Sequence, residues 1–312
     1  NFLLNWPWLM VLFWYTSAMA HDGDKFIGVD GGGTSCRVAL CDRDGKILGT
    51  GSSGSANVMT APETARDNIL EACQKALATA SVDLSELAKI PTFLGLAGAN
   101  IGECGNWVKE QLPFRNSIVE TDAYISLEGA VGDSDGVVAI IGTGTVFTYR
   151  QDGVVRTAGG WGFTVGDLAS GAWLGRRLLQ ESLLSYDGIH KGSALTRTVL
   201  EQFENNPQTV VEYAHTAVPG DFGKFAPLIF DYANQRDPIA RRIVQRAVAD
   251  IEETLDVILP DDDARFCMIG GLGPVYANLL SSYYRERISE PLGDAVTGAT
   301  QLAIKHFGKG AV

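Results

Sequence analysis

One local order of residues occurs twice in this chain and constrains its fold more than any other feature. Each copy runs from a strand-like apolar segment through a glycine–threonine segment into a second apolar segment and a turn. The first copy spans residues 26–45 and the second spans residues 137–153. Apolar runs joined by glycines predict β-hairpins, so the glycines are expected at strand–strand tips. We interpret the recurrence as a weak internal repeat, which predicts two domains of similar topology.

The rest of the chain alternates strand-like and helix-like segments, and this alternation predicts mixed sheets with helical crossovers. Helical periodicity begins at Pro62, after which Ala65, Ile69 and Ala76 recur at a three-to-four spacing. Further elements are expected as strands at 92–97, 118–122 and 266–269, as a mainly helical region at 166–259 with an irregular link at Pro207 and 219–227, and as a terminal helix at 296–306.

Composition narrows the class of protein. The 312 residues, 46% apolar and 20% charged, suit a globular protein of one large or two medium domains. The net charge of −12 argues against a nucleic-acid partner, which needs a basic face. The five cysteines are widely spread and form no C-x-x-C pair. This pattern predicts reduced thiols in a cytoplasmic protein rather than a disulfide framework or a zinc site.

Residues 1–21 differ from the remainder. The segment 2–15 is almost wholly apolar, and the small residues of 17–20 look like a signal-peptide cleavage region. No Lys or Arg precedes the apolar run, however, and the run is short for a membrane span. We therefore expect Met19 to be the native start, residues 1–21 to be a tail outside the fold, and the protein to have no membrane partner.

The first glycine tip carries the strongest chemical signal and reads Asp30-Gly31-Gly32-Gly33-Thr34. Glycines let backbone N–H groups crowd toward a phosphate, and an Asp at a strand end can order the waters around Mg²⁺. The second tip, Gly142-Thr143-Gly144-Thr145, has the same character. Each tip taken alone could also be a plain hairpin turn. The sequence contains neither a P-loop pattern nor a strand-to-helix G-x-G-x-x-G, so those nucleotide-binding folds lose their main support.

Three other positions could carry chemistry. Asp122 follows a strand-like run, where a carboxylate could take a proton from an acceptor hydroxyl or could simply cap a helix. Asp167 could bind paired sugar hydroxyls or cap the following helix. Gly270 and Gly271 follow the last strand, where a flat backbone could support an adenine ring or only turn the chain.

Taken in order, the motifs resemble the N-acetylglucosamine kinase / glucosamine kinase family, within the BadF/BadG/BcrA/BcrD-type ATPases of the actin-like ATPase superfamily. The resemblance covers about residues 25–307. It is carried by D-G-G-G-T-S-C-R (30–37), G-S-A-N (54–57), L-A-G-A (96–99), T-D-A (121–123), G-T-G-T (142–145), G-G-W-G (159–162), G-D-L-A-S-G-A-W-L-G (166–175) and G-G-L-G (270–273).

This resemblance implies an α/β fold of two ribonuclease-H-like domains, with mixed sheets flanked by helices and an inter-domain cleft that closes on ATP and sugar. The expected domains are residues 22–122 with 296–312, and residues 123–295. The implied activity is a phosphotransferase reaction from MgATP to a sugar alcohol. Whether the protein forms a homodimer is left open.

Each motif then receives a role from the resemblance. The implied roles are phosphate binding for Gly31, Gly32, Gly33, Thr34, Gly142, Thr143, Gly144 and Thr145; Mg²⁺ binding through water for Asp30; proton removal for Asp122; sugar contacts for Asn57, Asp122, Thr143 and Asp167; and adenosine contacts for Gly270 and Gly271.

The sugar is less well defined than the activity. Residues 221–230 look like bacterial glucosamine kinases, whereas 159–162 and 166–175 look closer to N-acetylglucosamine kinases. We expect phosphorylation of the 6-hydroxyl of glucosamine, with N-acetylglucosamine as the alternative. Further alternatives on this fold are an ATP-driven activator of a dehydratase, which would need cysteines for an iron–sulfur cluster, and a sugar-sensing regulator, which would need a basic DNA-binding module.

Overall fold

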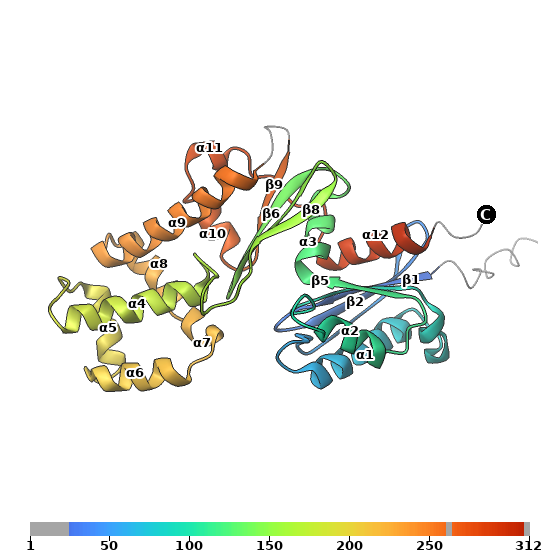
Figure 1. Cartoon of the computed structure of the whole chain (residues 1–312), viewed down its shortest axis with the longest axis horizontal. Helices are drawn as coiled ribbons and strands as arrows, with labels where there is room; N and C mark the ends of the chain where they lie inside the picture. The colour runs from blue at the N-terminus through green and yellow to red at the C-terminus, as the bar shows by residue number, and fades with distance from the viewer. Residues whose placement is uncertain (1–24, 260–263, 309–312) are drawn as a thin grey trace, which may run out of the picture. The chain divides into compact units, whose positions relative to one another are not determined.

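The computed structural model describes residues 25–259 and 264–308, and these form two compact units. One unit comprises the described residues up to Val119 and from Thr300 onward, and the other runs from Glu120 to Ala299. Each unit is built on its own mixed β-sheet flanked by helices (Figure 1). The predicted α/β class with two mixed sheets is confirmed.

The sheet of the first unit has five strands in the order β3-β2-β1-β4-β5. They are β1 (Lys25–Gly31), β2 (Cys36–Asp42), β3 (Ile47–Ser53), β4 (Thr92–Leu96) and β5 (Ser117–Thr121). The first three strands pair antiparallel, while β1 and β4 pair in parallel. The predicted first hairpin is therefore confirmed, and the parallel pair places the ends of β1 and β4 at the same edge.

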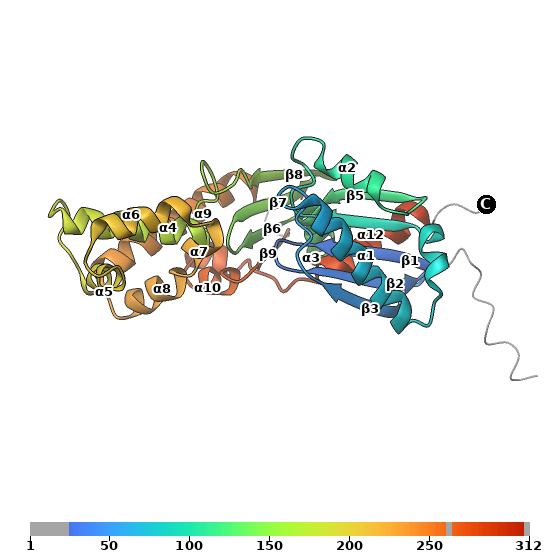
Figure 2. The same cartoon turned by 90° about the horizontal axis from the view of Figure 1, so that it is seen from below.

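Helices cover both faces of this first sheet (Figures 1 and 2). Alternate strand residues such as Ile27 and Leu40 pack against α1 (Pro62–Thr79), and α2 (Cys104–Gln111) joins the same core. On the opposite face, Phe93 contacts His306 of α12 (Ala295–Phe307) at 5.6 Å between ring centroids. A short 3₁₀ helix, η1 (Leu84–Lys89), precedes β4. The helix predicted from Pro62 is confirmed.

The sheet of the second unit has four strands in the order β8-β7-β6-β9. They are β6 (Gly136–Ile141), β7 (Thr145–Gln151), β8 (Val154–Gly159) and β9 (Arg265–Ile269). The pairs β6–β7 and β7–β8 are antiparallel, and β6–β9 is parallel. This order repeats the arrangement of β1, β2, β3 and β4, as the internal repeat predicted. The strand β8 itself was not predicted.

The helices of the second unit lie on the two faces of its sheet (Figure 2). On one face, α3 (Asp122–Val131) packs on Val138 and Cys267. On the other, a large core contains Val137 and Ala139 with the remaining helices. Those helices are α4 (Gly171–Tyr186), α5 (Ala194–Gln202), α6 (Pro207–Thr216), α7 (Pro219–Gly223), α8 (Ala226–Asn234), α9 (Pro238–Ile258), α10 (Gly273–Ala277) and α11 (Ser282–Arg285).

The irregular link expected at Pro207 and 219–227 is wrong. Pro207 and Pro219 each open a helix, and Pro227 lies in the first turn of another. A proline at the first helical positions lacks only an N–H that would have no intrahelical partner there, and its fixed φ suits the helix. The prolines therefore start helices in this region rather than interrupt them.

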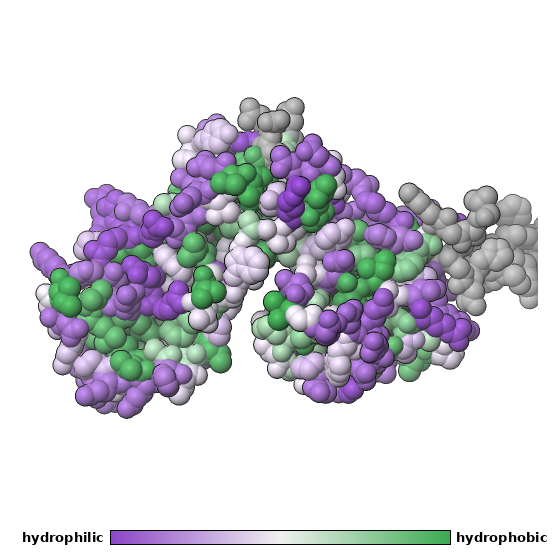
Figure 3. Space-filling view, viewed as in Figure 1, coloured by the Kyte–Doolittle hydropathy of each residue, from purple (hydrophilic) through white to green (hydrophobic). Residues whose placement is uncertain are grey.

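The surface carries both polar and apolar residues (Figure 3), and the cysteines are free thiols. On the face shown in Figure 3, hydrophilic residues are interspersed with apolar ones. Among the helices described, none combines the length and apolarity that a membrane crossing requires. All five cysteines are free, and burial raises the pKa of the Cys36 and Cys41 thiols to about 12.

Two glycines of β3 allow its close approach to α1, and they provide a test of the packing. A Cβ at Gly51 would lie 2.1 Å from the Ala72 carbonyl oxygen, and one at Gly49 would lie 2.3 Å from that of Ala76. Backbone cannot move away as a side chain can, so Gly51→Ala should lower stability by roughly 1–3 kcal/mol. The thermal unfolding midpoint should fall by several degrees. Gly220→Ala, where no described atom lies within 4 Å of the added Cβ, is the control, and equal midpoints would contradict this account.

Candidate active site

The first glycine tip, between β1 and β2, is anchored by its carbonyl groups. The Gly31 carbonyl accepts a hydrogen bond from the Ala97 N–H at 2.8 Å, and the Gly32 carbonyl accepts one from the Ala56 N–H at 2.9 Å. In a trans peptide the carbonyl of one residue and the N–H of the next point in opposite directions. With the Gly32 carbonyl turned toward Ala56, the N–H of Gly33 is directed away from it.

Gly31 and Gly33 of this tip have different surroundings. A Cβ at Gly31 would lie 2.5 Å from the Leu96 side chain and 3.0 Å from that of Ala56, so this position must be small for packing. A Cβ at Gly33 would meet no described atom within 4 Å, and Gly33 and Thr34 are exposed. Open space therefore lies over the outward-directed part of the tip.

Asp30 lies at the start of this tip and forms an ion pair. Its Oδ2 accepts from Arg37 on the neighbouring strand, at 3.0 Å from Nε and 2.5 Å from Nη2. The Asp30 side chain is only 14% exposed. The described residues contain no group of three or more His, Cys, Asp or Glu side chains that could hold a metal. One carboxylate suits Mg²⁺, which binds few protein ligands and retains water and phosphate oxygens.

Asn57 lies beside the same strand ends. Its Oδ1 accepts from the N–H groups of Met59 and Thr60 at 3.0 and 3.1 Å, which fixes the side chain over a turn. Within the described part of the chain its Nδ2 group donates no hydrogen bond. The fixed amide therefore has two donors available to a ligand.

The second glycine tip, between β6 and β7, is anchored in the same manner. The Gly142 carbonyl accepts from the Gly171 N–H at 2.8 Å, and the Thr143 carbonyl accepts from the Ala172 N–H at 3.3 Å. These donors belong to the first turn of α4, whose N–H groups have no partner inside the helix. The N–H groups of Thr143 and Gly144 consequently point away from α4, by the same geometry of the trans peptide. Thr143 is exposed.

Asp167 holds the loop before α4 onto this tip. Its carboxylate accepts from the N–H groups of Thr145 and Gly162, and a Cβ at Gly144 would lie 3.0 Å from its Oδ2. Burial raises the pKa of Asp167, and the two N–H donors partly offset that rise. Its φ of 51° lies in the left-handed region, which costs a non-glycine residue energy. The helix-cap alternative is wrong, because Ser170 caps α4.

Thr145 has a different environment from the other residues of its tip. It is buried, its N–H is bonded to Asp167, and its Oγ1 has no hydrogen-bond partner among the residues described. Its hydroxyl is therefore not presented at the surface. Any contribution of Thr145 to a site passes through its backbone and Asp167.

Asp122 is the first residue of α3, directly after β5. Thr121 is the N-cap, because its Oγ1 accepts from the Tyr124 N–H at 3.2 Å. The N-cap alternative for Asp122 is thus wrong, and the strand expected to reach residue 122 ends at Thr121. The Asp122 side chain is partly exposed, and its Oδ1 lies 2.9 Å from the Ala123 nitrogen. A carboxylate at a helix N-terminus is stabilised in its ionised form.

Gly270 and Gly271 connect β9 to α10. Gly270 has φ of 85°, and a Cβ there would lie 2.5 Å from the Ile141 carbonyl oxygen, so only glycine fits. Gly271 is exposed and meets no described atom within 4 Å of an added Cβ. The turn brings the chain directly into a pocket of about 530 Å³.

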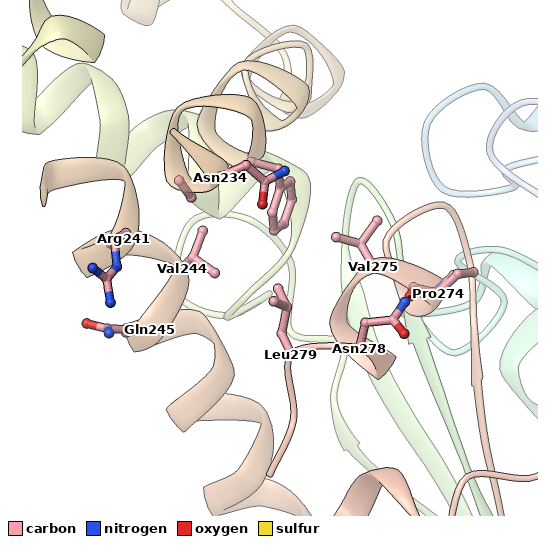
Figure 4. Close-up of a pocket in the computed structure, with 10 residues that line it drawn as sticks. Asn234, Arg241, Val244, Gln245, Pro274, Val275, Asn278 and Leu279 are labelled. Atoms are coloured by element: carbon pink, nitrogen blue, oxygen red, sulfur yellow. Dashed lines mark hydrogen bonds between the residues drawn. The ribbon is translucent and has the colours of Figure 1, made fainter. Parts of the chain in front are cut away.

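Sequence reasoning did not find this pocket, because its walls come from three separate helices. It lies between α8, α9 and α10, with Val244, Val275 and Leu279 forming apolar walls and Asn234, Gln245 and Asn278 adding polar groups (Figure 4). Such a volume and lining suit a flat heterocyclic ligand. Pro274, one of its lining residues, follows the Gly270–Gly273 turn in the first turn of α10.

Comparison with known proteins identifies the family to which the chain belongs. Residues 27–300 match the BadF/BadG/BcrA/BcrD ATPase family. The chain belongs to this family. The glucosamine kinase GspK of Vibrio cholerae is 33% identical over 281 residues, covering 90% of this chain and 96% of its own. The N-acetyl-D-glucosamine kinase of Dictyostelium discoideum is 26% identical, with 85% and 90% covered.

Solved structures agree with this family assignment. A protein of Chromobacterium violaceum, named as a putative N-acetylglucosamine kinase, is similar with a TM-score of 0.81 and 33% identity, covering 91% of this chain and all of its own. A ROK family glucokinase from Streptomyces griseus has a TM-score of 0.54 at 18% identity, covering 90% of this chain, which shows the fold alone. The family resemblance predicted from the motifs is confirmed.

The role of Asp167 in holding its loop can be tested directly. Asp167→Ala removes the acceptor of two backbone N–H groups. A hydrogen bond to a charged acceptor contributes about 1.5–3 kcal/mol, so hydrogen exchange in peptides covering Gly162 and Thr145 should accelerate by roughly 10–100-fold. Asp187→Ala, an exposed aspartate at the end of α4, is the matched control. Unchanged protection in Asp167→Ala would show that the loop is held by other contacts.

Proposed function

We propose that this protein is an ATP-dependent amino-sugar kinase that converts ATP and D-glucosamine into ADP and glucosamine 6-phosphate. The observation that carries the proposal is the pair of glycine tips whose carbonyls are bonded inward, which directs the following N–H groups outward. Outward N–H groups form an anion site without a cationic side chain. The substrate class follows from membership of the family and from 33% identity to a glucosamine kinase across its length.

Each tip is assigned to phosphate groups of ATP. In the first unit the phosphate contacts would come from Gly31, Gly32, Gly33 and Thr34, and Gly33 offers the outward N–H. In the second they would come from Gly142, Thr143 and Gly144, with the N–H groups of Thr143 and Gly144 outward. Thr145, predicted as a further phosphate contact, would support this tip instead, because its N–H is bonded to Asp167 and its hydroxyl is buried. Asp30 is assigned to Mg²⁺ through water, with the nucleotide bringing the ion. When bound, Mg²⁺ neutralises charge that develops on the phosphate oxygens.

Asp122 is assigned as the base. Its carboxylate would accept the proton of the sugar 6-hydroxyl as that oxygen forms a bond to the γ-phosphorus. The bond from the γ-phosphorus to the bridging oxygen breaks at the same time, and ADP leaves with the electron pair. Asp122, the first residue of α3, would accept this proton with a side chain that is partly exposed.

The remaining assignments concern contacts with the sugar and with the adenosine of ATP. Asn57 would donate from Nδ2 to the sugar, with Thr143 and Asp167 as further contacts. Gly270 and Gly271 would lie under the adenosine, and the adjoining pocket between α8, α9 and α10 would take the adenine ring. Apolar walls favour the ring faces, and the amide side chains of the pocket match its nitrogens.

N-acetylglucosamine is the second candidate acceptor. The Dictyostelium relative and the Chromobacterium structure bear that name, and both cover most of this chain. Discrimination of one small group is often worth only ~1–3 kcal/mol, so both sugars can be accepted at different rates. The activator alternative is less well supported. Four of the five thiols are buried, and those of Cys73 and Cys267 have raised pKa values because of burial, which disfavours the thiolates that bind iron. We place the enzyme in the cytoplasm, where ATP is available.

A panel of acceptors tests the function. ADP release is measured with glucosamine, N-acetylglucosamine, glucose and N-acetylmannosamine, and glucosamine should give the highest kcat/KM. Asp122→Asn should lower kcat by roughly 10²–10⁴, the usual weight of acid–base assistance, with ATP affinity nearly unchanged. Asp187→Asn is the control. ADP release that no sugar stimulates would refute the kinase, and wild-type turnover in Asp122→Asn would remove that residue from the mechanism.

A second experiment tests the adenine pocket. Val275→Trp should fill it and raise KM for ATP about tenfold or more, because losing even about 1.4 kcal/mol of binding costs that factor. The KM for the sugar should change little. Val257→Trp, which adds the same side chain at a position that is 84% exposed on α9, is the matched control. Equal KM values for ATP in the two variants would place adenine elsewhere.

A further inference from the structure

A second pocket of the same unit contains charged groups that the proposed reaction does not use. Its volume is about 430 Å³, and it lies between α4 and α9. It is lined by Leu168, Trp173, Arg176, Arg177, Gln180, Arg246 and Asp250. Neither Thr143 nor Asp167 is among these residues. Three guanidinium groups against one carboxylate make the lining positive, although the chain carries a net charge of −12.

Two of the arginines remain accessible. The side chain of Arg246 is 62% exposed, and that of Arg177 is 39% exposed. Arg177 donates to Gln180 within the pocket lining at 2.7 Å. The guanidinium group of Arg176 already has partners within the protein, since it donates to the Phe163 carbonyl at 3.0 Å and lies over the Phe163 ring. Arg177 and Arg246 therefore supply planar donors of the kind that bind phosphate or carboxylate.

Asp250 adds a buried carboxylate to the three guanidinium groups of the pocket. Its side chain is 2% exposed, and Arg246 lies 2.6 Å from Oδ1. Within the described part of the chain its Oδ2 has no hydrogen-bond partner. A buried carboxylate oxygen without a partner is costly, and the burial raises the pKa of Asp250 in spite of Arg246. A ligand that donated a hydrogen bond to Oδ2 would remove that cost.

The pocket also adjoins the loop that carries Asp167. Leu168, the next residue, is one of its walls, and the carbonyl of Ala169 accepts from the buried Tyr276 hydroxyl at 2.8 Å. On α9, Arg246 and Asp250 are one turn apart, whereas Arg241, Val244 and Gln245 line the adenine pocket. At 100° per residue these two sets point to different sides of the helix, so the second pocket is separate from the first.

We propose that the pocket between α4 and α9 is a binding site for a small phosphorylated sugar, with the phosphate on Arg177 and Arg246 and an amine or hydroxyl on Asp250. Arg177, Arg246 and Asp250 all line one volume that is large enough for such a molecule. The evidence for the pocket does not depend on the proposed kinase activity, but the choice of glucosamine 6-phosphate as a probe rests on that activity.

Calorimetric titration of the whole protein with glucosamine 6-phosphate and with inorganic phosphate tests the site. Saturating glucosamine and a non-hydrolysable ATP analogue are present to fill the proposed active site. Glucosamine 6-phosphate should bind about tenfold tighter than inorganic phosphate, the usual weight of one hydrogen bond to a charged group. Phosphate titrations without the other ligands keep the test informative even if the kinase proposal fails.

Two variants test separately the binding of the phosphate by Arg177 and the binding of the amine or hydroxyl by Asp250. Arg177→Ala should weaken both probes about tenfold by removing one charged donor, and Glu181 retains its contacts with Arg242 and His190 in that variant. Asp250→Asn should leave phosphate binding intact or stronger and reduce the preference for glucosamine 6-phosphate. Arg197→Ala, an exposed arginine on α5, is the control and should bind as wild type. No binding by wild type, or affinities unchanged in Arg177→Ala, would overturn the proposal.

Discussion

The inward hydrogen bonds of the tip carbonyls are the constraint on which the rest of the candidate site depends. The Gly32 carbonyl accepts the N–H of Ala56, and the carbonyls of Gly142 and Thr143 accept the N–H groups of Gly171 and Ala172. Because a trans peptide is planar, each bond fixes the direction of the next N–H as well. The direction of the outward N–H groups of a tip is thus set by the chain segment to which its carbonyls are bonded. In the second unit this support is the first turn of α4, which gains partners for N–H groups that the helix cannot satisfy itself.

Asp167 connects this arrangement to the loop that precedes α4. Its carboxylate bonds to one N–H from β7 and one from the loop, and this occurs at a left-handed backbone conformation and with partial burial. Both features cost energy, and residues with such costs persist only where surrounding contacts determine them. Leu168 and Ala169 extend the same short segment toward the arginine-lined pocket and toward Tyr276. Tip, loop and pocket therefore form one continuous set of contacts within the second unit.

The sequence was sufficient where local chemistry determines structure and insufficient where separate helices meet. Apolar runs around glycines predicted both hairpins, and the end of β5 was located to within one residue of Asp122. The prolines at 207 and 219 were misinterpreted because proline both breaks a helix and begins one, and only packing distinguishes the two cases. The pockets between α8, α9 and α10 and between α4 and α9 have no sequence motif. Their lining residues, such as Val244 and Asp250, follow ordinary helical periodicity.

The choice between an amine and an acetamide depends on few atoms, which explains why motifs point both ways. An ammonium group beside Asp167 would favour the ionised carboxylate and offset the burial that raises its pKa. An acetamide carbonyl would instead need a donor, and the Nδ2 of Asn57 is one that is already fixed by the bonds its oxygen makes. A difference of one small group is often worth only ~1–3 kcal/mol, so identity across the whole chain does not decide between the two sugars.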